Sequence, residues 1–160
     1  MGSVEIADMT REYAADIIAW RYPPPYDCYD LAGVEAAFLT DPGNGYLALV
    51  HEGRLIGFRV FGVDGQVPGG VYDGSALDTG GGLRPELTGR GLGRQAIATG
   101  LTYGTARFRP AAFRVTVAGF NLRAQRVLRG LDFTPTATFE ATTDGRPFVI
   151  MTRPAGDSVV

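Results

Sequence analysis

The residues best suited to chemistry lie in 83–94, where the sequence reads LRPELTGRGLGR. An apolar run ends there, glycine alternates with arginine, and an apolar helical pattern begins. Glycines allow backbone N–H groups to approach a ligand closely, and the first turn of a helix points unpaired N–H groups and a positive dipole end at the same place. Arg90 and Arg94 add guanidinium groups that suit phosphate oxygens. The stretch therefore predicts an anion-binding turn, better matched to a multiply charged phosphate than to a single carboxylate.

Length and composition indicate one domain, residues 1–160, around this turn. The chain is 45% hydrophobic and 20% charged, without long charge runs or low-complexity tracts, and this is typical of a globular protein with a substantial core. A formal net charge of -2 argues against a nucleic-acid surface, which needs a broad basic face. We therefore expect no nucleic-acid partner, and the sequence is compatible with either a monomer or a homodimer.

The remaining bulk features favour the cytoplasm. Cys28 is the only cysteine, so an internal disulfide is impossible and a reducing compartment is suitable. No stretch approaches the roughly 18 consecutive apolar residues of a membrane span, and residues 1–10 lack the pattern of a targeting segment. His51 is the only histidine and has no second candidate ligand nearby, so we assign it no role and predict no metal site.

The elements that must position the turn follow from hydrophobic periodicity and from residues that start or stop helices. Thr10, Asp30 and Asn121 are placed as helix N-caps. The predicted strands are 4–7, 46–51, 55–63, 76–83, 113–117, 133–141 and 148–152, and the predicted helices are 11–21, 31–39, 93–107 and 122–131. Residues 22–30 are predicted to be an extended segment, and 64–75 a glycine-rich loop.

A strand and a helix flank the anion-binding turn, and a second strand follows the helix. Strands 76–83 and 113–117 should therefore run parallel through a right-handed crossover. The predicted fold class is α/β (α+β), with a central mixed, mostly antiparallel sheet flanked by helices. Glycines in the second half of 76–83 suggest close approach of another backbone or of a ligand.

Two common phosphate-binding motifs fit this turn poorly. A P-loop ends in Gly-Lys-Ser/Thr, and this chain has no lysine because all 15 basic residues are arginine. A dinucleotide fingerprint follows the first strand, whereas this turn comes halfway along the chain. Both ligand classes are therefore disfavoured.

The chain resembles the GNAT N-acetyltransferase superfamily. The resemblance rests on a strand ending in Leu83-Arg84-Pro85, a Thr88-Gly89-Arg90-Gly91-Leu92-Gly93 turn that opens a helix, and a later strand-Asn121-helix-Phe133 unit. In that family the turn has the form Gln/Arg-x-x-Gly-x-Gly/Ala, and its amides hold the pyrophosphate of acetyl-CoA. Thr88 departs mildly from this form. The implied cosubstrate-binding residues are Leu83, Arg84, Thr88, Gly89, Arg90, Gly91, Leu92, Gly93, Arg94 and Asn121.

The resemblance implies transfer of an acetyl group from acetyl-CoA to a primary amine, by direct attack in a ternary complex. The Leu83 N–H is the natural oxyanion donor, because the implied geometry places the thioester carbonyl against this strand. An amine of pKa ~10 must lose a proton, and Asp78 is the preferred base, ahead of Asp73 and Glu86. A strand-end carboxylate without a catalytic role is the alternative for Asp78.

The general acid is the main departure from the family. A tyrosine is common four residues after the alanine that matches Ala124, and here that position is Leu128. A thiolate of pKa ~8.5 leaves readily, so turnover could survive, with Tyr103, Tyr72 or water as substitutes. The other possibility is a non-catalytic acyl-CoA-binding module.

The acceptor is expected in a pocket formed by 22–30, 64–75 and the final hairpin. The resemblance places the pocket there, and the aromatic content of these segments hints at a partly apolar or cationic ligand. A protein N-terminus and a small-molecule amine both remain open as acceptors.

Overall fold

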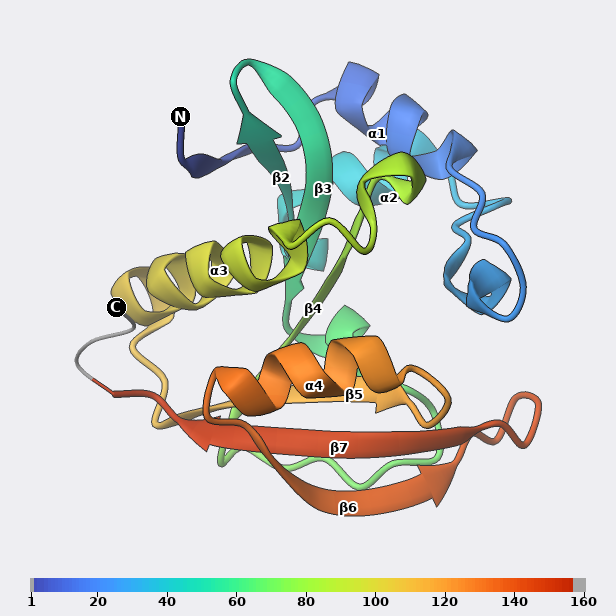
Figure 1. Ribbon diagram of the computed structural model, residues 1–160, viewed down its shortest axis with the longest axis vertical. Coiled ribbons are helices and arrows are strands. Elements are labelled where there is room, and N and C mark those ends of the chain that lie inside the picture. Colours follow the sequence, from blue (N-terminus) through green and yellow to red (C-terminus); the bar gives the residue numbers. More distant parts are fainter. Residues whose placement is uncertain (1, 157–160) are drawn as a thin grey trace.

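A computed structural model describes residues 2–156 and shows a seven-stranded mixed sheet in the order β1-β2-β3-β4-β5-β7-β6 (Figure 1). The strands are β1 (Val4–Asp8), β2 (Tyr46–His51), β3 (Arg54–Phe61), β4 (Leu77–Leu83), β5 (Ala112–Ala118), β6 (Thr134–Glu140) and β7 (Pro147–Pro154). The α-helices are α1 (Arg11–Ala19), α2 (Ala36–Thr40), α3 (Leu92–Phe108) and α4 (Leu122–Gly130). Short 3-10 turns are η1 (Tyr26–Tyr29), η2 (Pro42–Asn44), η3 (Val63–Gly65) and η4 (Pro85–Leu87).

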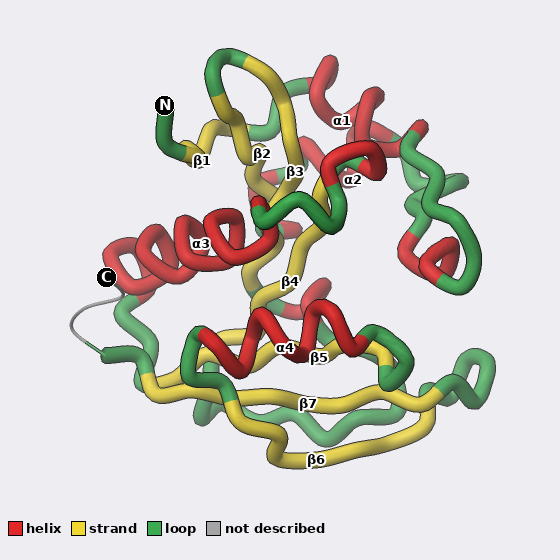
Figure 2. Tube along the Cα trace, in the orientation of Figure 1, coloured by secondary structure: helices red, strands yellow, loops and turns green. Residues whose placement is uncertain are grey.

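The sheet consists of two halves that meet only briefly. β4 pairs with β3 over its last five residues, in antiparallel register from Phe61 opposite Thr79 to Gly57 opposite Leu83. β4 also pairs with β5, in parallel, but only at Leu77 and Asp78. Figures 1 and 2 show the consequence, because β3 and β4 run at a steep angle to β5, β7 and β6. β4 and β5 therefore separate after Asp78, and this leaves a gap between two parallel strands.

Helices cover both faces of the sheet. On one face α3 and α4 pack on the strands, and Leu101 and Leu128 join Phe113, Val115 and Met151 in the largest apolar cluster. On the other face α1 and α2 pack on β2 and β3 through a second cluster of buried side chains. The alternating inward residues of β5 thus fix the register of the strand beside the gap.

Two of the three predicted N-caps are confirmed. The Thr10 hydroxyl accepts a hydrogen bond from the Tyr13 N–H, and the Asn121 side chain accepts one from the Ala124 N–H. Each bond satisfies one of the N–H groups that a helix start leaves unpaired.

The predicted helix 31–39 is wrong in its first half. The structure has a helix only from Ala36, with Glu35 at its N-cap, and Gly33 adopts a left-handed φ of 85° that interrupts a helix. Asp30 instead accepts a hydrogen bond from the Tyr22 N–H, so its carboxylate closes the 22–30 segment on itself.

Within residues 2–156, the structure contains no helix with both the length and the apolar character needed to cross a membrane.

Candidate active site

The open edge of β4 presents backbone donors to the gap. Arg84 N–H donates to Ile56 O and Gly62 N–H donates to Asp78 O, so in an antiparallel ladder the groups of Gly81 and Leu83 point away from β3. β5 does not pair with β4 beyond Asp78. The N–H groups of Gly81 and Leu83 therefore face the gap, as an oxyanion donor at Leu83 requires. The Leu83 carbonyl faces the same way and accepts a hydrogen bond from the Tyr22 hydroxyl at 2.5 Å.

The glycine turn lies at the mouth of this gap and opens α3. Gly91 is the N-cap of the helix, with a left-handed φ of 84° and no side-chain hydrogen bond to the helix amides. A Cβ added at Gly91 or Gly93 would meet no atom within 4 Å. The first N–H groups of a 17-residue helix are thus uncapped and open to approach, which is the arrangement that binds phosphate.

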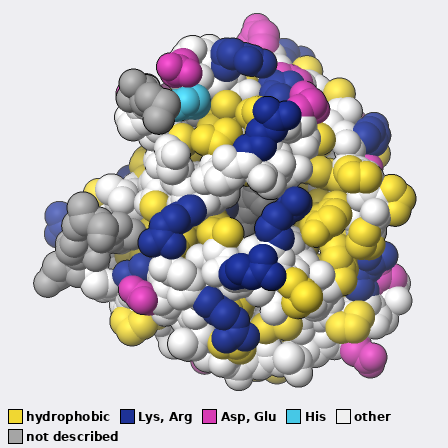
Figure 3. Space-filling model, viewed as in Figure 1, with side chains coloured by type: hydrophobic (Ala, Val, Ile, Leu, Met, Phe, Trp, Pro, Cys, Tyr) yellow, Lys and Arg dark blue, Asp and Glu magenta, His cyan; other side chains and the backbone are white. Residues whose placement is uncertain are grey.

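Arginine side chains surround this helix start. Arg90 and Arg94 are exposed, and Arg94 donates to the Gly130 carbonyl at 3.1 Å. Arg123 was not singled out from the sequence, yet its Nη1 lies 3.2 Å from the ideal Cβ position of Gly89, and its guanidinium stacks 5.0 Å from the Tyr26 ring centroid. Figure 3 shows arginine side chains gathered around a hollow on this face of the molecule.

Two of the sequence-predicted binding residues are engaged inside the protein. The Arg84 guanidinium donates to Asp16, 2.6 Å away, and to the Leu55 carbonyl, and it lies over the Trp20 ring. The Thr88 hydroxyl donates to the Pro85 carbonyl at 2.8 Å, so it stabilises the turn locally. Contacts of Arg84 and Thr88 with a ligand stay predictions.

Asn121 joins the end of β5 to the η1 segment. Besides capping α4, its Nδ2 donates to the Tyr29 hydroxyl at 3.1 Å, and that oxygen also accepts the Ala118 N–H at 3.3 Å. Burial raises the pKa of Tyr29, so the phenol stays neutral. The sequence marked Tyr29 only as one of several aromatics, because its partner lies 92 residues away in the chain.

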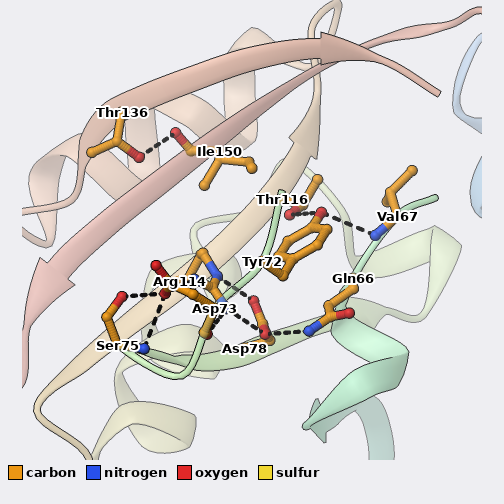
Figure 4. A network of polar contacts seen from close by, with 10 residues as sticks. All are labelled: Gln66, Val67, Tyr72, Asp73, Ser75, Asp78, Arg114, Thr116, Thr136 and Ile150. Atoms are coloured by element: carbon orange, nitrogen blue, oxygen red, sulfur yellow. Dashed lines mark hydrogen bonds and ion pairs between the residues drawn. The ribbon is translucent and has the colours of Figure 1, made fainter. Parts of the chain in front are cut away.

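Asp78 sits at the closed end of the gap, in a buried network (Figure 4). Its carboxylate accepts hydrogen bonds from Arg114 Nε at 2.6 Å and Nη2 at 2.8 Å, and from Gln66 Nε2 at 2.9 Å. Asp73 also pairs with Arg114, at 3.2 Å, and Asp78 is the main cause of the raised pKa of Arg114. Asp78 thus ties β4 to β5 and to the 64–75 loop, and its role as a base stays a prediction.

Comparison with known families decides the class of protein. The acetyltransferase (GNAT) family pattern matches residues 9–133. The chain belongs to the GNAT acetyltransferase family.

Solved structures of low sequence identity share the fold of this acetyltransferase. yncA of Salmonella typhimurium, described as an acetyltransferase and solved with its cofactor acetyl-CoA, is 17% identical, with a TM-score of 0.68 over 99% of this chain and 97% of that chain. SpeG, a spermidine N-acetyltransferase of Vibrio cholerae, is 13% identical, with a TM-score of 0.72 over 96% and 94%. An aminoglycoside acetyltransferase in complex with coenzyme A is 17% identical, with a TM-score of 0.72 over 95% of each chain. A search of curated proteins gives no match.

Leu128 stands where the family resemblance leads one to expect a general-acid tyrosine. Leu128 is 2% exposed and packs in the apolar core between α4 and β5. Of the predicted substitutes, Tyr103 packs against Phe61 on the α3 face. The Tyr72 hydroxyl is held by the Val67 N–H and by Thr116 Oγ1 on β5 (Figure 4).

The three segments expected to form the acceptor pocket of this acetyltransferase do meet beside β5. Tyr26 of η1 packs edge-on against Phe120, with ring centroids 5.3 Å apart, and Arg146 of the final hairpin lies over the same Phe120 ring. The Thr142 N–H of the hairpin donates to the Pro68 carbonyl of the 64–75 loop. The rings of Tyr26 and Phe120 therefore form an aromatic cluster on which two arginines stack, Arg123 of α4 and Arg146 of the final hairpin.

Proposed function

We propose that this GNAT protein transfers an acetyl group from acetyl-CoA to a primary amine by direct attack in a ternary complex. The observation that carries the proposal is the separation of β4 from β5 after Asp78, next to an uncapped helix start. A slot with strand donors on one wall and helix amides at its mouth suits a linear ligand with a pyrophosphate at one end.

The residues present fit acetyl-CoA. The N–H groups at the start of α3, beginning at Leu92, would hold the pyrophosphate, and the open space at Gly91 and Gly93 permits its close approach. Arg90 and Arg94 are exposed beside them and would add charge-assisted hydrogen bonds.

For this reaction the chain mainly has to orient the amine and the thioester and to stabilise the charge that develops between them. The amine nitrogen forms a bond to the acyl carbon, the carbon–sulfur bond breaks with its electron pair on sulfur, and the amine releases a proton. The Leu83 N–H would stabilise the charge on the carbonyl oxygen, because it is fixed by strand pairing and directed into the gap. Asp78 or a water chain would take the proton.

A specific observation favours a second candidate, a non-catalytic acyl-CoA-binding module. Leu128 is fully packed in the core, so no tyrosine-type acid can act from that position. The two candidates share the binding site and differ only in turnover.

Thiol release separates the candidates. Purified protein is incubated with acetyl-CoA and a panel of amines that includes small diamines, aminoglycosides, amino acids and peptides with free N-termini, while free CoA thiol is followed. The Gly91→Trp variant serves as a control, because a bulky side chain at the helix start should block CoA binding. Amine-dependent thiol release by the wild type alone supports the acetyltransferase. Tight CoA binding without release on any amine would favour the binding module, and equal CoA affinity in Gly91→Trp would refute the site.

The same panel narrows the acceptor. Release only with peptides would identify a protein N-terminus as the acceptor, and release with small amines would identify a small-molecule substrate. Mass spectrometry of the product, with an increase of one acetyl group on the amine, completes the assignment.

A further inference from the structure

Arg59 of β3 has a buried guanidinium that lies over the neighbouring strand β4, against Thr79 and Gly81. It is 6% exposed, and it lies opposite Gly81 in the sheet register. A Cβ at Gly81 would lie 2.8 Å from Nη1 and 3.0 Å from Cδ of Arg59, and a Cβ at Gly100 of α3 would lie 3.0 Å from Nε. Two glycines thus leave the space that the Arg59 side chain occupies between β4 and α3.

No carboxylate neutralises this guanidinium within residues 2–156. Its one side-chain hydrogen bond runs from Nη2 to Thr79 Oγ1, at 3.2 Å, and its buried Nε has no hydrogen-bond partner. Arg114, which is equally buried on the other face of the sheet, pairs with both Asp78 and Asp73. Arg59 is therefore a buried positive charge without a counter-charge in the part of the chain that the structure describes.

Such a charge is costly to keep. Burial lowers the pKa of Arg59 to about 10, because the charged form loses its hydration. An unpaired buried ion destabilises a protein by several kcal/mol, and a similarly sized apolar side chain would usually be tolerated better. A role in the ligand-bound protein would account for the charge.

The negative charge that Arg59 can meet arises in the gap. The Gly81 N–H, like that of Leu83, points into the gap, and the guanidinium lies against Gly81. When an amine attacks a thioester, negative charge develops first on the carbonyl oxygen and then on the departing sulfur. In a low-dielectric site, a fixed cation near this charge lowers the barrier without any proton transfer.

We infer that Arg59 stabilises the negative charge that forms on the thioester during transfer, and that it thereby takes the place of the proton donor missing at Leu128. This inference rests on the proposed function. It makes Arg59 an electrostatic component of the site, built into the sheet beneath β4.

The first test compares stability with turnover. Arg59→Met should unfold at the same or a higher urea concentration than the wild type, because a buried unpaired charge is removed. Its kcat with the best amine of the panel should fall about 10²-fold, the typical effect of losing one charge-stabilising group, with the acetyl-CoA affinity nearly unchanged. Arg59→Lys should recover part of kcat.

Arg153→Met is the matched control, since Arg153 is also buried and has no carboxylate partner among residues 2–156, but lies on β7. Its turnover per folded molecule should match the wild type.

The second test needs no acceptor. The thiol pKa of bound CoA is titrated by ultraviolet absorbance of the thiolate, in a Cys28→Ser background that removes the protein's own thiol. The thiol pKa of bound CoA should be lower in the wild type than in Arg59→Met.

If CoA fails to bind the wild type, the proposed function itself fails. If CoA binds but its thiol titrates identically in both proteins, the role of Arg59 is refuted. Faster turnover of succinyl-CoA than of acetyl-CoA, lost in Arg59→Met, would also refute it, because the cation would then serve an acyl carboxylate.

Discussion

Asp78 and Arg114 form a bidentate ion pair at the last position where β4 and β5 are paired, with Nε–Oδ1 at 2.6 Å and Nη2–Oδ2 at 2.8 Å. Both side chains are buried, and both project from the face of the sheet opposite α3 and α4. The pair therefore fastens the two halves of the sheet at the point from which the gap between β4 and β5 opens.

Asp78→Asn should destabilise the protein by about 3–5 kcal/mol, because it leaves the buried Arg114 without its main counter-charge. Urea unfolding measures this. Asp73→Asn, which removes the exposed partner of the same arginine, should lower the stability far less, because solvent screens that pair. An Asp78→Asn protein of normal stability that has lost turnover would instead favour the predicted role of Asp78 as a base.

Gly93→Leu should weaken CoA binding by at least about tenfold without loss of stability. Gly93 is in α3, and its Cβ position is open, so a leucine fits the apo protein and removes a poor helix former worth up to about 1 kcal/mol. Calorimetric titration with CoA and urea unfolding report the two effects. Thr102→Leu, exposed farther along α3, should leave CoA affinity unchanged. Equal CoA affinities in the wild type, Gly93→Leu and Thr102→Leu would show that the pyrophosphate does not bind at this helix start.

Arg123→Met should lower CoA affinity about tenfold at low salt, and the difference should shrink as salt rises, because an exposed cation acts through a screened interaction. The expectation follows from the position of Arg123 beside Gly89 and over the Tyr26 ring. Arg107→Met removes an arginine that stacks on Phe108 at the far end of α3 and is the control. A salt-independent loss would point to packing on Tyr26 as the cause.

Alkaline pH should destabilise the protein through its buried phenols. Burial is the main cause of the raised pKa of Tyr22, whose hydroxyl donates to the Leu83 carbonyl. The unfolded chain releases the Tyr22 proton near pH ~10, whereas the folded chain releases it only at a higher pH. The contribution of Tyr22 to the free energy of unfolding is therefore complete below pH ~10 and falls as the pH rises above it. The chain has no lysine, which keeps this window free of ammonium titration.

Tyr22→Phe, made in a Cys28→Ser background, tests whether Tyr22 causes this loss of stability at alkaline pH. The free energy of unfolding between about pH 9 and about pH 11 should fall less steeply in this variant than in Cys28→Ser alone. Tyr46 has a raised pKa for the same main reason, so part of the slope should remain. An identical slope in both proteins would contradict the assignment to Tyr22.

Local sequence features determined much of the architecture. Hydrophobic periodicity and cap residues predicted the bounds of β2 without error, and those of the other strands and of α3 to within two residues at every end. They could do so because each element buries one face and is bounded by residues that start or stop it. The exception was 31–39, where one left-handed glycine outweighed the helical pattern. The glycine-arginine turn also indicated a phosphate-bearing ligand, since its chemistry is contained in consecutive residues, and the family resemblance named that ligand as acetyl-CoA.

Only the tertiary structure decided which groups face the gap. The directions of the Gly81 and Leu83 amides depend on the register of β3 against β4, and the ion pair of Asp78 depends on a partner 36 residues away. Arg59 is a second example, because its sequence neighbours are ordinary strand residues. Only the structure shows that Gly81 and Gly100 enclose it and that residues 2–156 offer it no counter-charge. Contacts between distant segments follow from how the sheet and helices pack, and no local pattern encodes them.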